Sequence, residues 1–328
     1  MRGSTAPATT EYRTSGSGPH GRLVRVRLPV DLPATLGPLR VGRSDPCVAV
    51  APDGAWWRAT RTPLGPATVR YAPRPREAGI RVEAWGPGAA WVLEVAHEAL
   101  GGLDTLDGFD PPRGSPVREA HRRFPGLRVT RSNAVFEALL PTILAQKVTS
   151  IEAIRSYRDL VRAWGEPAPG PAGWIGGGQG GLLLPPRPER LAGEPYFAYH
   201  AFGIEMRRAN AVRAAAARAA ALEGLLEGSS EEGQRRLRSI PGVGAWTAAA
   251  VAGTAFGDPD AVPVGDYHLP NTVAWVFAGE PRADDARMLE LLRPYAGHRG
   301  RVLRLLALAG ARAPKFGPRQ PLRSFRRL

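Results

Sequence analysis

The chain has 328 residues and a formal net charge of +14 at pH 7, from 44 Lys and Arg against 30 Asp and Glu. This length allows two or three domains with buried cores. The excess of positive charge favours a polyanionic partner, although a basic surface also serves solubility alone. The sequence holds no apolar run of about eighteen residues and no apolar N-terminal stretch with a cleavage site, so it predicts neither membrane insertion nor secretion, and a cytoplasmic location.

Cysteine and histidine usage limits the cofactors that the chain can hold. Cys47 is the only cysteine, which excludes an intramolecular disulfide and a four-cysteine iron–sulfur cluster. The six histidines are scattered, without the spacing of metal ligands. No cofactor and no side-chain metal site are therefore expected.

The N-terminal part divides into a tail and a sheet. Residues 1–20 are rich in Ser, Thr, Gly and Pro and predict a disordered tail. Residues 21–112 carry short alternating stretches typical of strands, with Asp53-Gly54 as a hairpin signal and a helix expected over 89–100. This segment is predicted to be an α+β domain with an antiparallel sheet. The strand candidates are 22–28, 47–50, 56–60, 67–71 and 80–85.

From residue 113 to 311 apolar residues recur at helical spacing, which indicates a helical domain. Pro141 is expected to kink or divide its first long helical stretch. Residues 165–188 are dense in Gly and Pro and predict a flexible surface loop without fixed secondary structure. The basic C-terminal tail, 312–328, is expected either to track a phosphate backbone or to be a solvated terminus. Helices are predicted at 133–143, 144–164, 209–222, 230–240, 245–256, 269–278, 283–292 and 298–309.

A short segment from Leu237 to Ala248 combines a tight turn with two helical stretches. Within it, Gly242 and Gly244 flank Val243. Two glycines permit a turn that most side chains would block, so helix, hairpin and helix are predicted. The amides of Gly242, Val243 and Gly244 would then lack intrahelical acceptors and suit a phosphate oxygen without reading base sequence. The alternative is that the turn only joins two core helices.

This Pro-Gly-Val-Gly turn, followed downstream by Gly265-Asp266, resembles the signature of the helix-hairpin-helix DNA glycosylases. Within that superfamily the chain is most similar to the bacterial DNA-3-methyladenine glycosylase II, or alkyl-base, type. Specific motifs carry the resemblance over residues 113–310, whereas residues 21–112 match only in pattern. The resemblance implies a mainly α fold with an N-terminal α+β domain. Its implied partner is double-stranded DNA with a damaged base, bound by a monomer at the nucleoid.

By the same resemblance Asp266 is the catalytic residue. Cleavage of the bond between a base and deoxyribose builds positive charge on the sugar, so an anion beside the anomeric carbon stabilises the transition state. Asp266 precedes a helix predicted to open near Leu269, whose free amides and dipole keep a carboxylate ionised. The alternative role is that of a helix N-cap, and one carboxylate can hold both roles.

The resemblance places Trp246, Tyr267 and Tyr295 around the base pocket. Trp246 stands where glycosylases with lyase activity carry a lysine, so a monofunctional enzyme that uses water is implied. An aromatic face suits N-alkylated purines because they carry positive charge. Where relatives have a further aromatic residue this chain has Ala250, which predicts a wider pocket.

Residues 143–149 resemble the segment whose side chain fills the gap left by a flipped base. Flipping costs a few kcal/mol, and a plug offsets part of that cost. The plug residue here is Lys147, where the alkyl-base glycosylases use an apolar side chain. The alternatives are that Lys147 only faces solvent, or that its amine adds weak lyase chemistry. Gln146 and Thr247 are also expected at the DNA interface.

The hairpin of this family commonly binds a monovalent cation through main-chain carbonyls. By the resemblance these would be the carbonyls of Arg238, Ile240 and Val243, and the ion would help to orient the amides toward phosphate.

Together these residues imply hydrolytic excision of an alkylated purine, 3-methyladenine or 7-methylguanine, from duplex DNA by base flipping, which initiates base excision repair. Two alternatives remain open: an oxidised-purine glycosylase of the same fold, and a non-catalytic DNA-binding protein that kept the hairpin. The presence of Asp266 argues against the second alternative.

Overall fold

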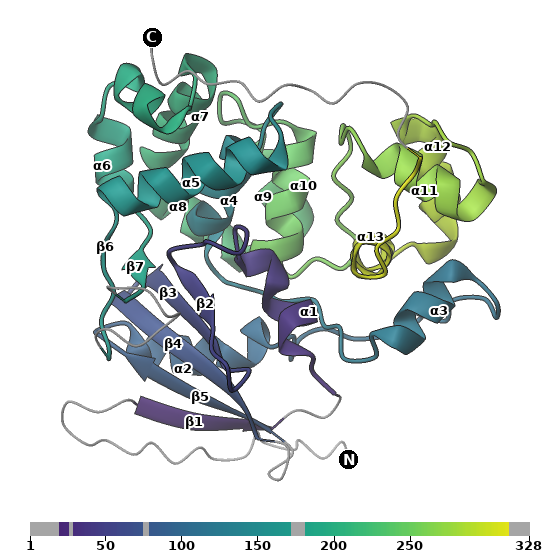
Figure 1. Cartoon of the computed structure of the whole chain (residues 1–328), viewed down its shortest axis with the longest axis horizontal. Helices are drawn as coiled ribbons and strands as arrows, with labels where there is room; N and C mark the ends of the chain where they lie inside the picture. The colour runs from purple at the N-terminus through teal and green to yellow at the C-terminus, as the bar shows by residue number, and fades with distance from the viewer. Residues whose placement is uncertain (1–19, 26–28, 75–78, 172–180, 315–328) are drawn as a thin grey trace.

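The computed structural model describes residues 20–25, 29–74, 79–171 and 181–314. An antiparallel sheet lies at one side of a larger group of helices (Figure 1). The predicted disordered tail, apart from His20, and the basic tail beyond residue 314 lie outside the described residues. His20 opens a strand, so it does not belong to a disordered tail. No helix in the described ranges is long and apolar enough to span a membrane.

Five strands form one antiparallel sheet in the order β1-β5-β4-β3-β2, as the alternating pattern predicted. The turn between β2 and β3 contains Gly54 at φ +78°, a left-handed conformation that favours glycine. The strands are β1 His20–Arg25, β2 Val48–Val50, β3 Trp56–Thr62, β4 Gly65–Arg74 and β5 Gly79–Trp85. Helix α2, Ala89–Ala99, packs against β1, β4 and β5 and is followed by Gly101 at φ +77°.

The remaining elements are mainly helical. A capping box starts α5, in which the side chains of Thr149 and Glu152 each accept the other residue's backbone amide. Helices α11, α12 and α13 form a separate group at the right of Figure 1. The helices and 3₁₀ turns are α1 Leu32–Leu36, η1 Gly37–Leu39, α3 Pro116–Arg123, α4 Val135–Leu144, α5 Ser150–Trp164, α6 Pro188–Gly193, η3 Tyr196–Phe202, α7 Met206–Ala216, α8 Ala219–Glu223, η4 Gly224–Glu227, α9 Ser230–Leu237, α10 Ala245–Val251, α11 Leu269–Ala278, α12 Asp285–Leu292, η6 Arg293–Tyr295 and α13 Arg299–Leu308, with one π-helical turn, η5 Ala252–Phe256.

Two hydrophobic clusters hold these elements together. The first includes Val69 of β4, Leu139 of α4 and Val251 of α10, so the sheet and the central helices share one core. The second joins α3 to α11, α12 and α13 and includes Val273 and Met288. The predicted domain boundary near residue 112 therefore does not separate two hydrophobic cores, because the sheet and the central helices share the first cluster. The segment between α10 and α11 connects the first cluster to the second.

The prediction of a flexible Gly- and Pro-rich loop over 165–188 is partly wrong. Two short strands, β6 Glu166–Pro167 and β7 Leu183–Leu184, pair within it, and α6 begins at its end. Leu184 is 2% exposed and joins a small cluster with Trp57 on the sheet. Burial of apolar side chains against the sheet orders the segment despite its composition. Residues 172–180 lie outside the described ranges.

Two predicted helix boundaries also differ from the structure. The single helix expected over 209–222 is broken between α7 and α8, which lets Glu223 accept the amides of Val135 and Phe136 at the start of α4. Pro141 does not divide α4, which continues to Leu144. The break falls at 145–149, where Lys147 has φ +55° and cannot continue a helix.

Candidate functional site

The hairpin between α9 and α10 uses its two glycines differently. Gly242 has φ +86°, and a Cβ there would lie 2.6 Å from the Cβ of Ala211. Gly244 has φ −99° and ψ −175°, which any residue adopts, and a Cβ there would meet no atom within 4 Å. The fold therefore requires glycine at 242, whereas at 244 the absent side chain serves only to leave the surface open.

The amides of this hairpin are only partly free. The Val243 amide donates to the carbonyl of Ile240 at 3.0 Å, and the Val243 side chain is 5% exposed. This corrects the prediction that Val243 faces phosphate, because a 3₁₀-type turn has already engaged its amide. Gly242 and Gly244 are exposed, and no residue in the described ranges accepts a hydrogen bond from either amide. The surface thus presents two unsatisfied donors.

Gln146 braces the hairpin from the loop that follows α4. Its Nε2 donates to the carbonyl of Gly242 and to Oγ1 of Thr247, each at 2.9 Å. Thr247 is 2% exposed, so its side chain does not reach the surface as predicted. Gln146 and Thr247 thus connect the loop at 145–149 to the hairpin, and contact of Gln146 with DNA stays a prediction.

Lys147 lies exposed in that loop and has φ +55°, one of two positive-φ residues other than glycine in the described part of the chain. A left-handed conformation at such a residue costs about 1–3 kcal/mol and is often found at functional sites. The preceding helix end is fixed by Arg208, which is 2% exposed and donates through Nη1 to the carbonyl of Leu144 at 2.7 Å. The loop is therefore held in a strained shape that projects one cation.

Asp266 is fixed by three hydrogen bonds to its carboxylate. Oδ1 accepts from the amides of His268 at 2.7 Å and Leu269 at 2.9 Å, at the start of α11. Oδ2 accepts from the indole Nε1 of Trp246 at 2.9 Å. Asp266 is half-buried and accepts the first amides of α11, but the N-cap position itself belongs to His268, two residues later than predicted.

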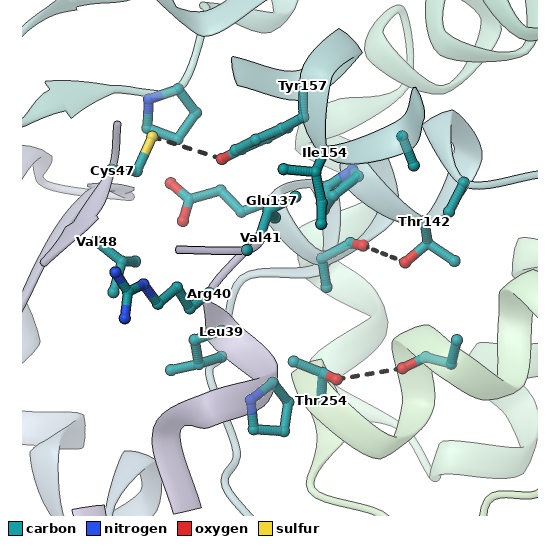
Figure 2. A pocket seen from close by; sticks show the side chains of 18 of the residues that line it. Leu39, Arg40, Val41, Cys47, Val48, Glu137, Thr142, Ile154, Tyr157 and Thr254 are labelled. Carbon is teal, nitrogen blue, oxygen red and sulfur yellow. Dashed lines mark hydrogen bonds between the residues drawn. The ribbon is translucent and has the colours of Figure 1, made fainter. Parts of the chain in front are cut away.

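Trp246 and Ala250 are among the residues that line a pocket of about 380 Å³. The pocket lies between the sheet and the helices: Leu39, Arg40 and Val48 line one side, and Ile154 and Thr142 the other (Figure 2). Because Trp246 contacts both this pocket and Asp266, it connects the pocket to the carboxylate. Ala250 adds no ring here, and the wider pocket expected from this residue stays a prediction.

The two tyrosines predicted in the pocket lie elsewhere. Tyr267 is 81% exposed on the surface next to Asp266, with its ring against His268. Tyr295 is 9% exposed in the second hydrophobic cluster, with its ring 5.7 Å from that of Phe277. Packing among α11, α12 and η6 withdraws Tyr295 from the pocket, which corrects that prediction.

The polar wall of the pocket was not among the site residues predicted from the sequence. Glu137 of α4 accepts from Arg58 Nη2 at 2.7 Å, from Thr60 Oγ1 at 2.8 Å and from the amide of Arg61 at 2.6 Å. Arg58 is 8% exposed and lines the pocket. The alternation of β3 was the available signal, because it places Arg58 on the same face as Thr60. Glu137 is saturated with donors, so its role is to hold the Arg58 guanidinium in place.

Cys47 and Tyr157 form a second polar contact in the pocket. The Tyr157 hydroxyl donates to Sγ of Cys47 at 3.5 Å (Figure 2). Burial raises the pKa of the Cys47 thiol and that of the Tyr157 phenol. The thiol is therefore protonated at neutral pH and is not a nucleophile, because the thiolate is the reactive form.

No cluster of three His, Cys, Asp or Glu side chains with the geometry of a metal site occurs within the described ranges. The carbonyls of Arg238, Ile240 and Val243, predicted to bind a monovalent cation, all belong to the hairpin. Oxygen donors of this kind suit a hard cation. The Ile240 carbonyl already accepts the Val243 amide, which leaves it one lone pair for an ion.

Comparison with known proteins extends these observations. No family model matches the chain. Two curated proteins of Mycobacterium tuberculosis strains, each named "Probable bifunctional transcriptional activator/DNA repair enzyme AlkA", are 28% identical to it over 276 residues. The match covers 80% of this chain and 52% of each relative, so the chain spans about half the length of the relatives it matches.

Two solved structures share the fold over nearly their whole length. A 3-methyladenine DNA-glycosylase from Archaeoglobus fulgidus superposes with a TM-score of 0.69 at 21% identity, covering 86% of this chain and 96% of that one. An 8-oxoguanine glycosylase/lyase from Clostridium acetobutylicum superposes with a TM-score of 0.66 at 14% identity, covering 92% and 98%. With the hairpin and the carboxylate behind it, these findings show that the chain has the fold of the helix-hairpin-helix DNA glycosylases and is similar in sequence to curated proteins of the AlkA type.

Proposed function

We propose that this chain is a monofunctional DNA glycosylase that hydrolyses the bond between an alkylated purine and deoxyribose in duplex DNA. The observation that carries the proposal is Asp266, whose carboxylate is fixed by two amides and by the Trp246 indole. A carboxylate held in this way cannot rotate away from a sugar that gains positive charge. The activity in the names of the relatives supports the same reaction.

The surrounding residues support a flipped base rather than a bound nucleotide. The pocket begins at Trp246, beside Asp266, and continues between the sheet and the helices. An alkylated purine in contact with the Trp246 ring would gain on the order of 1–2 kcal/mol from its positive charge. No lysine stands at position 246, so water is the nucleophile in this proposal and the DNA strand stays intact. The chain would act as a monomer at the nucleoid and initiate base excision repair.

The hairpin is proposed to bind a phosphate of the DNA backbone through the amides of Gly242 and Gly244. We expect Gly244→Val to weaken binding to lesion and undamaged duplexes equally, by about tenfold, because a phosphate contact carries no sequence information. The fold should tolerate this change, since a Cβ at 244 meets no atom within 4 Å. Fluorescence anisotropy with both duplexes measures the effect.

Gly242→Ala is the matched control. It introduces a side chain at φ +86° and 2.6 Å from Ala211, so it should lower the melting temperature, whereas Gly244→Val should not. A loss of binding by Gly244→Val that is confined to the lesion duplex would assign this glycine to the base pocket instead.

Lys147 is proposed to enter the gap left by the flipped base. We expect Lys147→Ala to slow excision of a paired lesion at least tenfold more than excision of the same lesion opposite a mismatch, where extrusion costs less. Single-turnover rates on the two duplexes measure this difference. Equal slowing would leave Lys147 as an ordinary phosphate contact. Borohydride trapping of wild type but not of the variant would establish lyase chemistry at Lys147.

The proposal is tested by incubating the protein with duplexes that each carry one defined lesion. Free 3-methyladenine or 7-methylguanine is expected, with an equal amount of abasic sites and without strand cleavage. The second candidate is an oxidised purine, which the Arg58 guanidinium in the pocket wall favours, because it can donate to a carbonyl of the base. Release of 8-oxoguanine in preference to the alkylated bases would decide for this second function, and release of no base would overturn both.

The monovalent cation is retained as a proposal with its own test. If the three hairpin carbonyls hold an ion, replacing potassium by a large organic cation at constant ionic strength should lower DNA affinity. The same exchange should leave a hairpin already weakened by Gly244→Val almost unchanged.

A further inference from the structure

We propose that Asp285 is a positioning residue for Asp266, an inference that rests on the proposed function. Asp285 is the first residue of α12, and its Oδ2 accepts the amide of Gly265 at 3.0 Å, across 20 positions of the sequence. Gly265 directly precedes Asp266 and has φ +90°. This hydrogen bond fixes the Val264–Gly265 peptide, one residue before the chain reaches Asp266.

Asp285 is not needed to cap its own helix. Asp284 is the N-cap of α12, and its side chain accepts the amide of Arg287 at 2.9 Å. The second carboxylate oxygen of Asp285, Oδ1, is buried, and no donor from the described residues reaches it. An unsatisfied buried acceptor destabilises the folded chain. Asp285 therefore differs from Asp284 in its hydrogen bond to the Gly265 amide, whereas Asp284 caps the helix.

The two carboxylates act on different parts of the same segment. The three hydrogen bonds of Asp266 fix its carboxylate, whereas Asp285 fixes the main chain before it. Asp285 also ties the start of α12 to this loop, beside the hydrogen bond from the amide of Ala283 to Oδ1 of Asn271. Without Asp285 the left-handed turn at Gly265 can relax and move Asp266. A displacement of about 1 Å can lower a rate roughly a hundredfold.

Four variants separate positioning from charge and from capping. Asp285→Ala removes the acceptor, and Asp285→Glu keeps the charge but moves the acceptor by one methylene. Both are expected to slow single-turnover excision about 10- to 100-fold, with affinity for the lesion duplex within twofold of wild type. Asp285→Asn keeps an oxygen that can accept from Gly265 and should stay within about threefold of wild type. Asp284→Ala should lower the melting temperature and leave the excision rate unchanged.

A second readout does not depend on catalysis. The Trp246 indole N–H donates to Asp266, so its hydrogen exchange reports the position of that carboxylate. Exchange of this proton should accelerate about tenfold in Asp285→Ala and Asp285→Glu, and should not change in Asp285→Asn or Asp284→Ala. Unchanged indole exchange in Asp285→Ala would overturn the positioning role even if the protein excises bases. Accelerated exchange in a protein without excision would uphold the positioning role and overturn the proposed function alone.

Discussion

Asp266→Asn is expected to slow base excision by about two to four orders of magnitude while lesion DNA binds with near wild-type affinity. An opposite charge about 4 Å away is worth roughly 4 kcal/mol at an effective dielectric near 20, which corresponds to about a thousandfold in rate. An asparagine oxygen can still accept the amides of His268 and Leu269, so the start of α11 should remain intact. Single-turnover excision and equilibrium binding, measured on the same duplex, separate the two effects.

Trp246→Phe is the matched control for this prediction. It removes the indole donor to Asp266 but retains an aromatic ring and the negative charge. We expect a smaller loss than for Asp266→Asn, because the carboxylate keeps its two amide donors. Excision by Asp266→Asn above a tenth of the wild-type rate would remove Asp266 from the catalytic role.

Asp104→Ala is expected to lower the free energy of unfolding by about 3–5 kcal/mol, because it leaves a buried cation without its partner. Asp104 and Arg301 of α13 form an ion pair in which both side chains are 1% exposed. Asp104 also accepts the amide of Val129 at 3.0 Å, so the pair joins α13 to the segment that leads into α4. Urea unfolding followed by circular dichroism measures the loss.

Asp110→Ala provides the control for the buried pair. Asp110 contacts Arg118 at 2.9 Å, but its side chain is 92% exposed, so its removal should cost at most about 1 kcal/mol. The double variant with Asp104→Leu and Arg301→Met should recover much of the lost stability, because it removes the unpaired charge. Similar losses for Asp104→Ala and Asp110→Ala would show that burial does not strengthen the role of Asp104.

Local signals in the sequence predicted the parts of the site that depend on neighbouring residues. The glycine-flanked turn, the helix at 269–278 and the contact of its first amides with Asp266 were predicted because each depends on residues within a few positions. Gly242 is an example: a turn signal alone indicates its positive φ. The sheet followed from the alternating pattern in the same way.

Contacts between distant segments could not be predicted. Gln146 meets Gly242 across 96 positions, and Arg58 meets Glu137 across 79. No periodicity indicates such pairs, because they depend on how finished elements pack. The placement of Tyr295 failed for the same reason: its position in the family motif does not show that α11 and α12 bury it. The prediction that the Val243 amide faces phosphate was wrong for a local reason, because that amide donates to a carbonyl within the turn.

Binding to an uncleavable abasic analogue tests most directly whether Asp266 is the anion beside a cationic sugar. A duplex with a pyrrolidine ring, which is protonated at neutral pH, is compared with one that carries the neutral tetrahydrofuran ring. Wild type should bind the charged ring at least a hundredfold more tightly, because it imitates the transition state. Asp266→Asn should lose this preference and keep its affinity for the neutral ring. Equal affinity of wild type for both duplexes, or an unchanged preference in Asp266→Asn, would contradict this role.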